Sequence, residues 1–149
     1  TPATGHFFGL KEAVAMIEEE GLENVFARHD RLAEATRRAV RQWGFEVLCA
    51  DPRAYASALT AVLLPEGVNA DAVRAVILER FDLSLGAGLG KVAGKVFRIG
   101  HLGWVNELMV AGALAGVEMG LAAAGVKHSS GGVQAAMDYL AGNASFHGR

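Results

Sequence analysis

The chain has 149 residues, of which 52% are hydrophobic and 20% charged, a composition typical of one globular domain and not of a disordered chain. The formal net charge of -2 lacks the basic excess of a dedicated nucleic-acid-binding domain. A single cysteine, Cys49, excludes an internal disulfide and fits a reducing compartment. The sequence opens on TPATG with neither Met nor a secretory signal, so we expect Thr1 to be the cut end of a longer protein.

Two helices are predicted in the first third of the chain. The first begins near residues 6–8 and ends before Gly21, because apolar residues recur there at intervals of three and four. The second runs from Leu22 to Trp43 and is closed by Gly44. Its buried side is expected to consist of Val25, Phe26, Leu32, Ala39, Val40 and Trp43.

The second helix also carries five arginines, which suggest a basic surface. Acidic residues are interleaved with them, and Glu34 and Arg38 have the i,i+4 spacing of a favourable ion pair. We therefore interpret this face as a solvated helix surface and not as a nucleic-acid-binding one. The five residues are Arg28, Arg31, Arg37, Arg38 and Arg41.

Four strands are predicted in the middle of the chain from short runs of β-branched and aromatic residues. Between the second and third strands, Asn69 is a good N-cap for a helix that continues to Arg80. The strands are FEVLC (45–49), ALTAVLLP (58–65), DLSL (82–85) and KVFRIG (95–100).

A mostly apolar stretch, residues 104–125, is long enough to span a membrane. Glu107 and Glu118 would be costly in lipid, so we expect a helix of a soluble fold instead. One more short helix is expected at 133–140. This order of elements predicts an α+β fold, a sheet of three or four strands with helices packed on one face.

The segment GAGLGKVAGKVFRIGHLG, residues 86–103, suggests a phosphate-binding loop because it is rich in glycine and cations. It does not match a P-loop, since neither Gly90-Lys91 nor Gly94-Lys95 has the required first glycine or a following Ser or Thr. Gly88, Gly90 and Ala93 match a dinucleotide fingerprint, but a β-type run follows them where that motif requires a helix.

Signals for metal binding and nucleophilic catalysis are weak. The five histidines are scattered with no pair at ligand spacing, so no metal site is expected. Cys49 lies in a predicted apolar strand, which favours a buried, inert thiol.

Arg98 is the strongest candidate for a binding residue. Strand alternation places Phe97 and Ile99 on one face of the sheet and Val96 and Arg98 on the other. An arginine among apolar residues, beside a glycine loop, can present its planar fork to a carboxylate ligand. A structural ion pair within the fold is the alternative, and the local sequence favours it.

Several segments together resemble class V pyridoxal-phosphate-dependent aminotransferases in their C-terminal part. The closest resemblance is to serine–glyoxylate and alanine–glyoxylate aminotransferases, and it covers about residues 1–125. The segments, in order, are TPATG, GLKEAVAMIEEEGLENVFARH, GLGKVAGKVFRIGHLG and NELM…GALAGVEMGL.

The resemblance implies that residues 1–126 are a small C-terminal domain packed on a larger cofactor domain within a homodimer. Residues 127–149 would be a linker and tail. The intact cytoplasmic enzyme would transfer an amino group from serine or alanine to glyoxylate through pyridoxal phosphate. Such an enzyme has small amino-acid and keto-acid substrates, and neither a nucleic acid nor a membrane as partner.

The same resemblance assigns roles to individual residues. Arg98 would bind the substrate carboxylate, and Thr1 would reach the cofactor phosphate of the other subunit. Gly88, Leu89 and Gly90 would form a loop at the mouth of the active site. No catalytic residue is expected in this chain, because the family's Schiff-base lysine lies upstream, and the isolated chain is therefore expected to be inactive.

Two other functions stay open at this point. A cysteine desulfurase of the same class would need a reactive cysteine on a mobile loop, and Cys49 is predicted on a strand. The chain could also be a freestanding binding or interaction module that uses this fold without catalysis.

Overall fold

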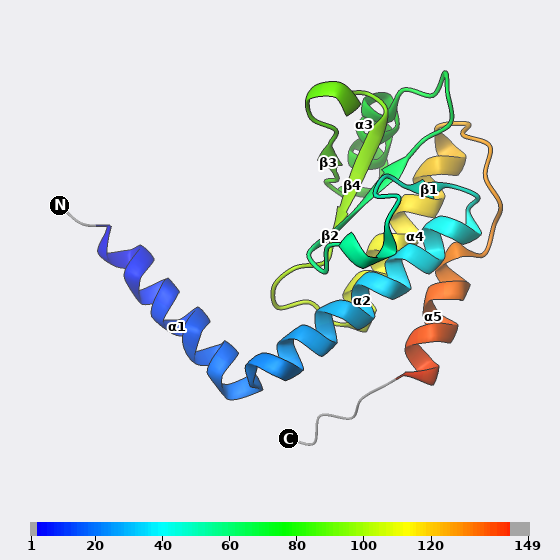
Figure 1. The fold of residues 1–149 in the computed structure, drawn as a ribbon. Coiled ribbons are helices and arrows are strands. Elements are labelled where there is room, and N and C mark those ends of the chain that lie inside the picture. Colours follow the sequence, from blue (N-terminus) through cyan, green and yellow to red (C-terminus); the bar gives the residue numbers. More distant parts are fainter. Residues whose placement is uncertain (1–2, 144–149) are drawn as a thin grey trace.

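The computed structural model of the protein describes residues 3–143. Figure 1 shows a small sheet covered by helices, with the first helix extending away from them. The helices are α1 (Thr4–Glu20), α2 (Leu22–Gln42), α3 (Ala70–Phe81), α4 (Glu107–Ala123) and α5 (Gly132–Gly142). The strands are β1 (Glu46–Val47), β2 (Leu59–Leu63), β3 (Gly86–Ala87) and β4 (Val96–Gly100), and the single 3-10 turns are η1 (Pro52–Ala54) and η2 (Gly90–Val92).

The four strands form one antiparallel sheet in the order β1-β2-β4-β3. Within it, β4 lies between β2 and β3 and is paired along both edges. Phe97 and Ile99 belong to the hydrophobic core, whereas Arg98 between them projects from the opposite face. The alternation predicted for this strand is confirmed.

Helices α2 and α3 pack on the core face of the sheet, and α4 and α5 pack behind them. All four helices and the sheet contribute to one hydrophobic cluster, so the predicted α+β fold is confirmed. The largest fully buried apolar side chains in it are Trp43, Phe97, Leu32, Ile77, Leu114 and Leu121.

The helix α5 continues this core. Ala136 and Leu140 of α5 are buried in the same cluster as α2. The carboxylate of Glu118 in α4 accepts hydrogen bonds from the backbone N–H groups of Gly131, at 2.7 Å, and Val133, at 3.0 Å. The Glu118 side chain thus provides acceptors for N–H groups at the start of α5 that have no partner within that helix.

The helix α1 is connected to α2 at Gly21, whose φ of 84° permits a sharp change of direction. No residue of α1 is buried, and its apolar stripe faces solvent. Phe26, in the second turn of α2, was expected on the buried side but is 52% exposed. The reason is that the first turns of α2 also extend beyond the sheet (Figure 1).

The third strand is displaced from its predicted position at residues 82–85. Asp82 has φ 51° and ends α3 by donating its N–H to the Leu78 carbonyl. The carbonyl of Leu85 accepts a hydrogen bond from Arg74 Nε at 2.8 Å, and the Leu85 side chain is buried in the core. These residues therefore make no sheet ladder, and β3 begins at Gly86.

Two further expectations are wrong in detail. Arg37 was expected on a solvated face but is buried, with its guanidinium 4.9 Å from the centre of the Tyr55 ring and its Nε bonded to Glu34 at 3.2 Å. Cys49 was expected within a strand, but β1 ends at Val47 and Cys49 is half-buried beyond it. The predicted pair of Glu34 and Arg38 is present at 3.1 Å.

Among residues 3–143, no helix combines the length and the apolar character that crossing a membrane requires. The glycines of α4 instead allow close packing on neighbouring elements. A Cβ at Gly120 would lie 2.1 Å from Ile77 Cγ1 of α3, and one at Gly116 would lie 2.9 Å from Leu83 Cδ2. The small residues of α4 therefore contribute to packing between helices.

Candidate functional site

Arg98 occupies the centre of the sheet face that the helices leave uncovered. Its partner in the register on β2 is Ala61, and its partner on β3 is Gly86. Both neighbours are small, so the Arg98 side chain lies between two strands that offer little side-chain volume. The residue is half-buried.

The Arg98 guanidinium makes no ion pair and no hydrogen bond within residues 3–143. Its Nε is buried and has no acceptor. A buried N–H without a partner costs about 1–3 kcal/mol, which makes this arrangement unfavourable as a purely structural one. The structural ion pair, which the local sequence favoured, is therefore not formed by the described residues.

The glycine loop leaves the sheet directly beside Arg98. The Gly88 N–H donates to the Val96 carbonyl at 3.1 Å, and a Cβ at Gly88 would lie 2.1 Å from the Val92 oxygen. Leu89 is 69% exposed, and Gly90 has φ 56°. The loop is thus folded back on the start of β4, with the Leu89 side chain projecting into solvent.

This loop does not have the geometry of a dinucleotide site. The three-residue turn η2 follows it and leads into β4, so no helix N-terminus is directed at a phosphate position. The strand predicted after Ala93, where a dinucleotide fingerprint requires a helix, is confirmed.

The loop after β4 is held by the second helix. Arg28 Nη1 donates to the carbonyl oxygens of Gly103 at 2.9 Å and Val105 at 3.0 Å, and its Nε is paired with Glu20 at 2.6 Å. His29 Nδ1 lies 2.7 Å from the Val25 oxygen, so it carries the hydrogen, and Nε2 accepts from the Gly103 N–H at 3.0 Å. The segments GLENVFARH and GKVFRIGHLG, far apart in sequence, therefore meet at this loop.

His101 anchors the same loop to β2. Its Nδ1 lies 2.9 Å from the Ser57 oxygen and its Nε2 lies 3.0 Å from Thr60 Oγ1, so both ring nitrogens are satisfied. Burial lowers the pKa of His101 to about 4, with smaller contributions from the charges of Arg37 and His29, while the bond to Ser57 opposes the shift. His101 is therefore neutral near pH 7 and has a structural role.

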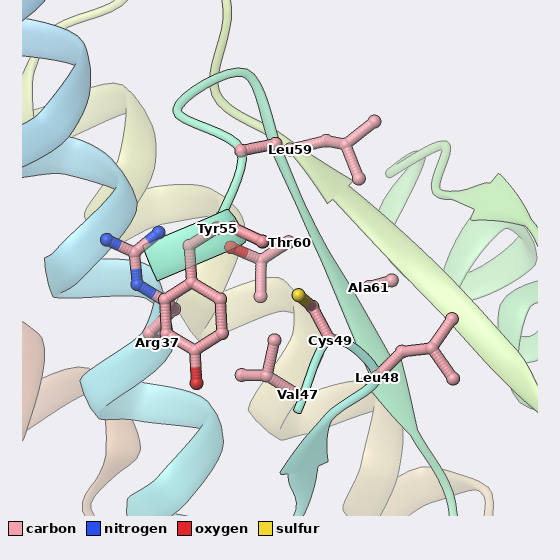
Figure 2. Close-up of a pocket in the computed structure, with 10 residues that line it drawn as sticks. Arg37, Val47, Leu48, Cys49, Tyr55, Leu59, Thr60 and Ala61 are labelled. Carbon is pink, nitrogen blue, oxygen red and sulfur yellow. The ribbon is translucent and has the colours of Figure 1, made fainter. Parts of the chain in front are cut away.

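A cavity of about 190 Å³ lies between α2, η1 and β2 (Figure 2), and Arg98 does not line it. Its lining is mainly apolar. Figure 2 shows Arg37 reaching from α2 toward the Tyr55 ring, with Cys49 near Thr60. The thiol of Cys49 is 3.4 Å from the Asp51 carbonyl oxygen, to which it donates.

None of the lysines is placed to bind a cofactor covalently. The lysines, Lys11, Lys91, Lys95 and Lys127, are all exposed, so none lies in an enclosed pocket suited to a Schiff base. Among residues 3–143, no cluster of His, Cys, Asp and Glu could hold a metal ion. Thr1, for which a contact to the cofactor phosphate was expected, lies outside the described residues.

Gly86 and Ala61 were not predicted as neighbours of Arg98. Ala61 lies in a strand that was predicted, but its register against β4 is not readable from the sequence. Gly86 was assigned to a loop because the third strand was placed at 82–85. The available signal was the small size of residues 86–88, which is compatible with a strand edge approached by a long side chain.

The chain is similar to curated aminotransferases over almost its whole length. It is 51% identical over 144 residues to a serine–glyoxylate aminotransferase of Methylorubrum extorquens, covering 96% of the chain and 36% of that protein. It is 48% identical over 141 residues to a serine–glyoxylate aminotransferase of Arabidopsis thaliana, covering 94% and 35%. The chain thus spans about a third of the length of these relatives, and no protein-family model matches it.

Solved structures agree with this result. Pyridoxamine–pyruvate aminotransferase from Mesorhizobium loti matches with a TM-score of 0.90 and 33% identity, over 97% of this chain and 37% of that one. Ureidoglycine–glyoxylate aminotransferase from Bacillus subtilis matches with a TM-score of 0.82 and 30% identity, over 89% of this chain and 34% of that one. The chain therefore belongs to the class V aminotransferase family and corresponds to the C-terminal part of its members.

Proposed function

We propose that this chain supplies the substrate-binding domain of a pyridoxal-phosphate-dependent aminotransferase that moves an amino group from serine or alanine to glyoxylate. Residues 1–126, together with α5, which shares their hydrophobic core, form the C-terminal small domain of that enzyme. Arg98 binds the carboxylate shared by the amino-acid and keto-acid substrates. The loop of Gly88, Leu89 and Gly90 borders the entrance to the site.

The observation that carries this proposal is the buried, unpaired Nε of Arg98 on the open face of the sheet. A guanidinium fork of this kind matches a carboxylate in geometry and charge, and a ligand carboxylate would provide the acceptor that the described residues do not. This chain would contribute the orientation of the substrate, through the pairing of Arg98 with its carboxylate. The cofactor supplies the electron sink for amino-group transfer, and the upstream part of the enzyme holds it.

The exposed stripe of α1 supports a larger partner domain. Phe7, Phe8 and Leu10 are each at least 60% exposed, and Val14 and Ile17 are more than 40% exposed. A contiguous apolar surface of this kind typically marks an interface. We assign it to the upstream domain within a homodimer, with Thr1 near the cofactor phosphate of the other subunit and the enzyme in the cytoplasm.

Replacement of Arg98 in the full-length enzyme tests the proposal. Arg98→Ala should leave the bound cofactor and its absorbance unchanged but raise KM for the amino-acid substrate at least about thirtyfold, because a desolvated charge pair contributes about 2–5 kcal/mol. Arg98→Lys should give an intermediate KM, since lysine keeps the charge and loses the planar fork. Steady-state kinetics with a cofactor titration measures both effects.

Arg53→Ala is a matched control. It removes the same charge from an arginine whose side chain is 90% exposed and forms an ion pair with the nearby Asp51. It should leave KM unchanged. An unchanged KM in Arg98→Ala would remove Arg98 from the binding site.

The isolated chain is expected to lack transaminase activity. Treatment with pyridoxal phosphate and borohydride should label it no more than a denatured control, because no described lysine is enclosed. A single stoichiometric adduct on one lysine would contradict this expectation.

A freestanding binding module of the same fold is the second candidate. It predicts that the 149-residue chain alone is monodisperse and that its thermal stability increases with a small ligand. The uncovered stripe of α1 argues against it, and aggregation that is relieved by polar substitutions at Phe7 and Phe8 would exclude it.

A further inference from the structure

We propose that Gly86 is a positioning residue for Arg98: the missing side chain at this position of β3 lets the guanidinium lie across that strand, and so determines where a substrate carboxylate is bound. This inference rests on the proposed function of Arg98. It concerns a residue that would itself make no contact with the substrate.

The first argument is the contact between the two residues. Gly86 and Arg98 are partners in the register of β3 and β4. A Cβ built on Gly86 would lie 3.0 Å from Arg98 Nε, 3.1 Å from its Cβ and 3.5 Å from its Cζ. The Arg98 side chain therefore occupies the space that any other residue at position 86 would fill.

The second argument is that the contact involves the root of the side chain as well as its end. A flexible tip could move aside from an added methyl group, but Arg98 Cβ is attached directly to the backbone of a strand paired on both edges. Relief of the 3.1 Å contact with Cβ thus requires a shift of β3 relative to β4, and relief of the 3.0 Å contact with Nε requires a different side-chain torsion. Either change displaces the guanidinium.

The third argument is that the backbone does not require glycine at this position. Gly86 is not among the glycines with positive φ, so alanine fits its backbone conformation. Gly88, two residues later, differs because a Cβ there would lie 2.1 Å from the Val92 oxygen. At Gly86 the three nearest atoms all belong to Arg98, so a substitution at this position would displace mainly the Arg98 side chain.

The fourth argument is the state of the guanidinium. Within residues 3–143, Arg98 Nε is buried without an acceptor, and the register partners of Arg98 are Gly86 of β3 and Ala61 of β2. An unpaired buried donor does not itself stabilise the sheet, so hydrogen bonding within the fold does not account for the close approach. Holding the fork in a fixed orientation before ligand binding is the benefit that the geometry offers, because a prepositioned group loses less freedom on binding.

The test uses Gly86→Ala in the full-length enzyme with its cofactor. We expect KM for the amino-acid substrate to rise about tenfold with kcat changed less than about twofold, because small displacements of a positioning group weaken binding strongly. Gly100→Ala is the matched control: it lies on β4 and has no positive φ, a Cβ added there would meet no atom within 4 Å, and KM should stay unchanged.

A double-mutant cycle separates positioning from a general structural effect. In the Arg98→Ala background, adding Gly86→Ala should raise KM no further, because the side chain on which Gly86 acts is gone. The Nε–H resonance of Arg98 in an NMR spectrum should also shift in Gly86→Ala and stay in place in Gly100→Ala, which gives a readout that is independent of activity.

The outcomes distinguish this inference from the proposed function. If Arg98→Ala raises KM and Gly86→Ala does not, the positioning role is overturned and the proposed function stands. Additive effects of the two substitutions would also overturn it. If Arg98→Ala leaves KM unchanged, the proposed function fails. If Gly86→Ala prevents folding, Gly86→Ala with Arg98→Ala decides: restored folding supports the contact with Arg98, and continued misfolding overturns it.

Discussion

The two faces of the sheet differ in what their side chains do, although they alternate along the same strand. On the core face, Phe97 and Ile99 are almost completely buried beneath the helices. On the opposite face, Arg98 lies between its register partners Ala61 and Gly86, and its Nε has no acceptor among the residues that the structure describes. The side chains of the core face find their packing partners within the fold, whereas the Arg98 guanidinium finds no hydrogen-bond partner among the described residues. If Arg98 binds the substrate as proposed, alternate residues of β4 serve stability and ligand binding, and substitutions should separate the two.

The largest effect on stability is expected from Phe97→Ala. Phe97 is completely buried in the core, so the truncation leaves a cavity and removes a large apolar contact area. The free energy of unfolding of the chain should fall by about 3–5 kcal/mol, measured by urea denaturation. Leu89→Ala, at a 69% exposed position, should change it by less than about 0.5 kcal/mol. Equal effects of the two would contradict the assignment of Phe97 to the core face.

A pH-dependent effect of similar size is expected from His101, which is also on the core side of the molecule. Its pKa is about 4 in the folded chain and 6.5 as an unperturbed side chain. Above pH 6.5 the ring is neutral in both states and contributes nothing. As the pH falls from 6.5 to 4, the unfolded chain binds a proton that the folded chain does not, so the free energy of unfolding should fall by about 3 kcal/mol and then level off.

His101→Gln isolates this contribution from those of the carboxyl groups. Glutamine does not titrate, so the difference in unfolding free energy between the wild type and the variant should depend on pH only between about 6.5 and 4. Urea denaturation at half-unit pH steps gives the two curves. Parallel curves through this window would show that His101 does not carry the effect.

The elements of the core face were well predicted from the sequence because their signals are local. Helix periodicity, the Asn69 cap and the β-type run before Gly100 each indicated an element that the structure contains. Asn69 Oδ1 accepts from the N–H groups of Asp71 at 2.9 Å and Ala72 at 3.1 Å, as its position before the helix predicted. Alternation along β4 also correctly predicted that Arg98 and Phe97 lie on opposite faces of the sheet.

The surroundings of Arg98 were not predictable in the same way, because they depend on contacts between distant segments. Whether Arg98 has an ion-pair partner depends on which strands lie beside it, and the sequence does not reveal that register. The displaced third strand shows the difficulty: Asp82 in the left-handed conformation and the bond from Arg74 to the Leu85 carbonyl exclude residues 82–85 from the sheet. The position of the glycine opposite Arg98 followed only from the folded chain.

The smallest effect on stability is expected at Arg98 itself, and it provides the sharpest test of the difference between the two faces. Arg98→Ala removes a buried N–H that has no acceptor among residues 3–143, and this loss should stabilise the folded state. It also removes the packing of the side chain against Gly86, and this loss should destabilise the folded state. Because these contributions have opposite signs, the free energy of unfolding should change by less than about 1 kcal/mol. Urea denaturation of Arg98→Ala and Phe97→Ala under the same conditions compares the losses of unfolding free energy at these two adjacent residues. A loss as large as that of Phe97→Ala would mean that Arg98 supports the fold, and its unpaired Nε would then no longer favour a ligand-binding role.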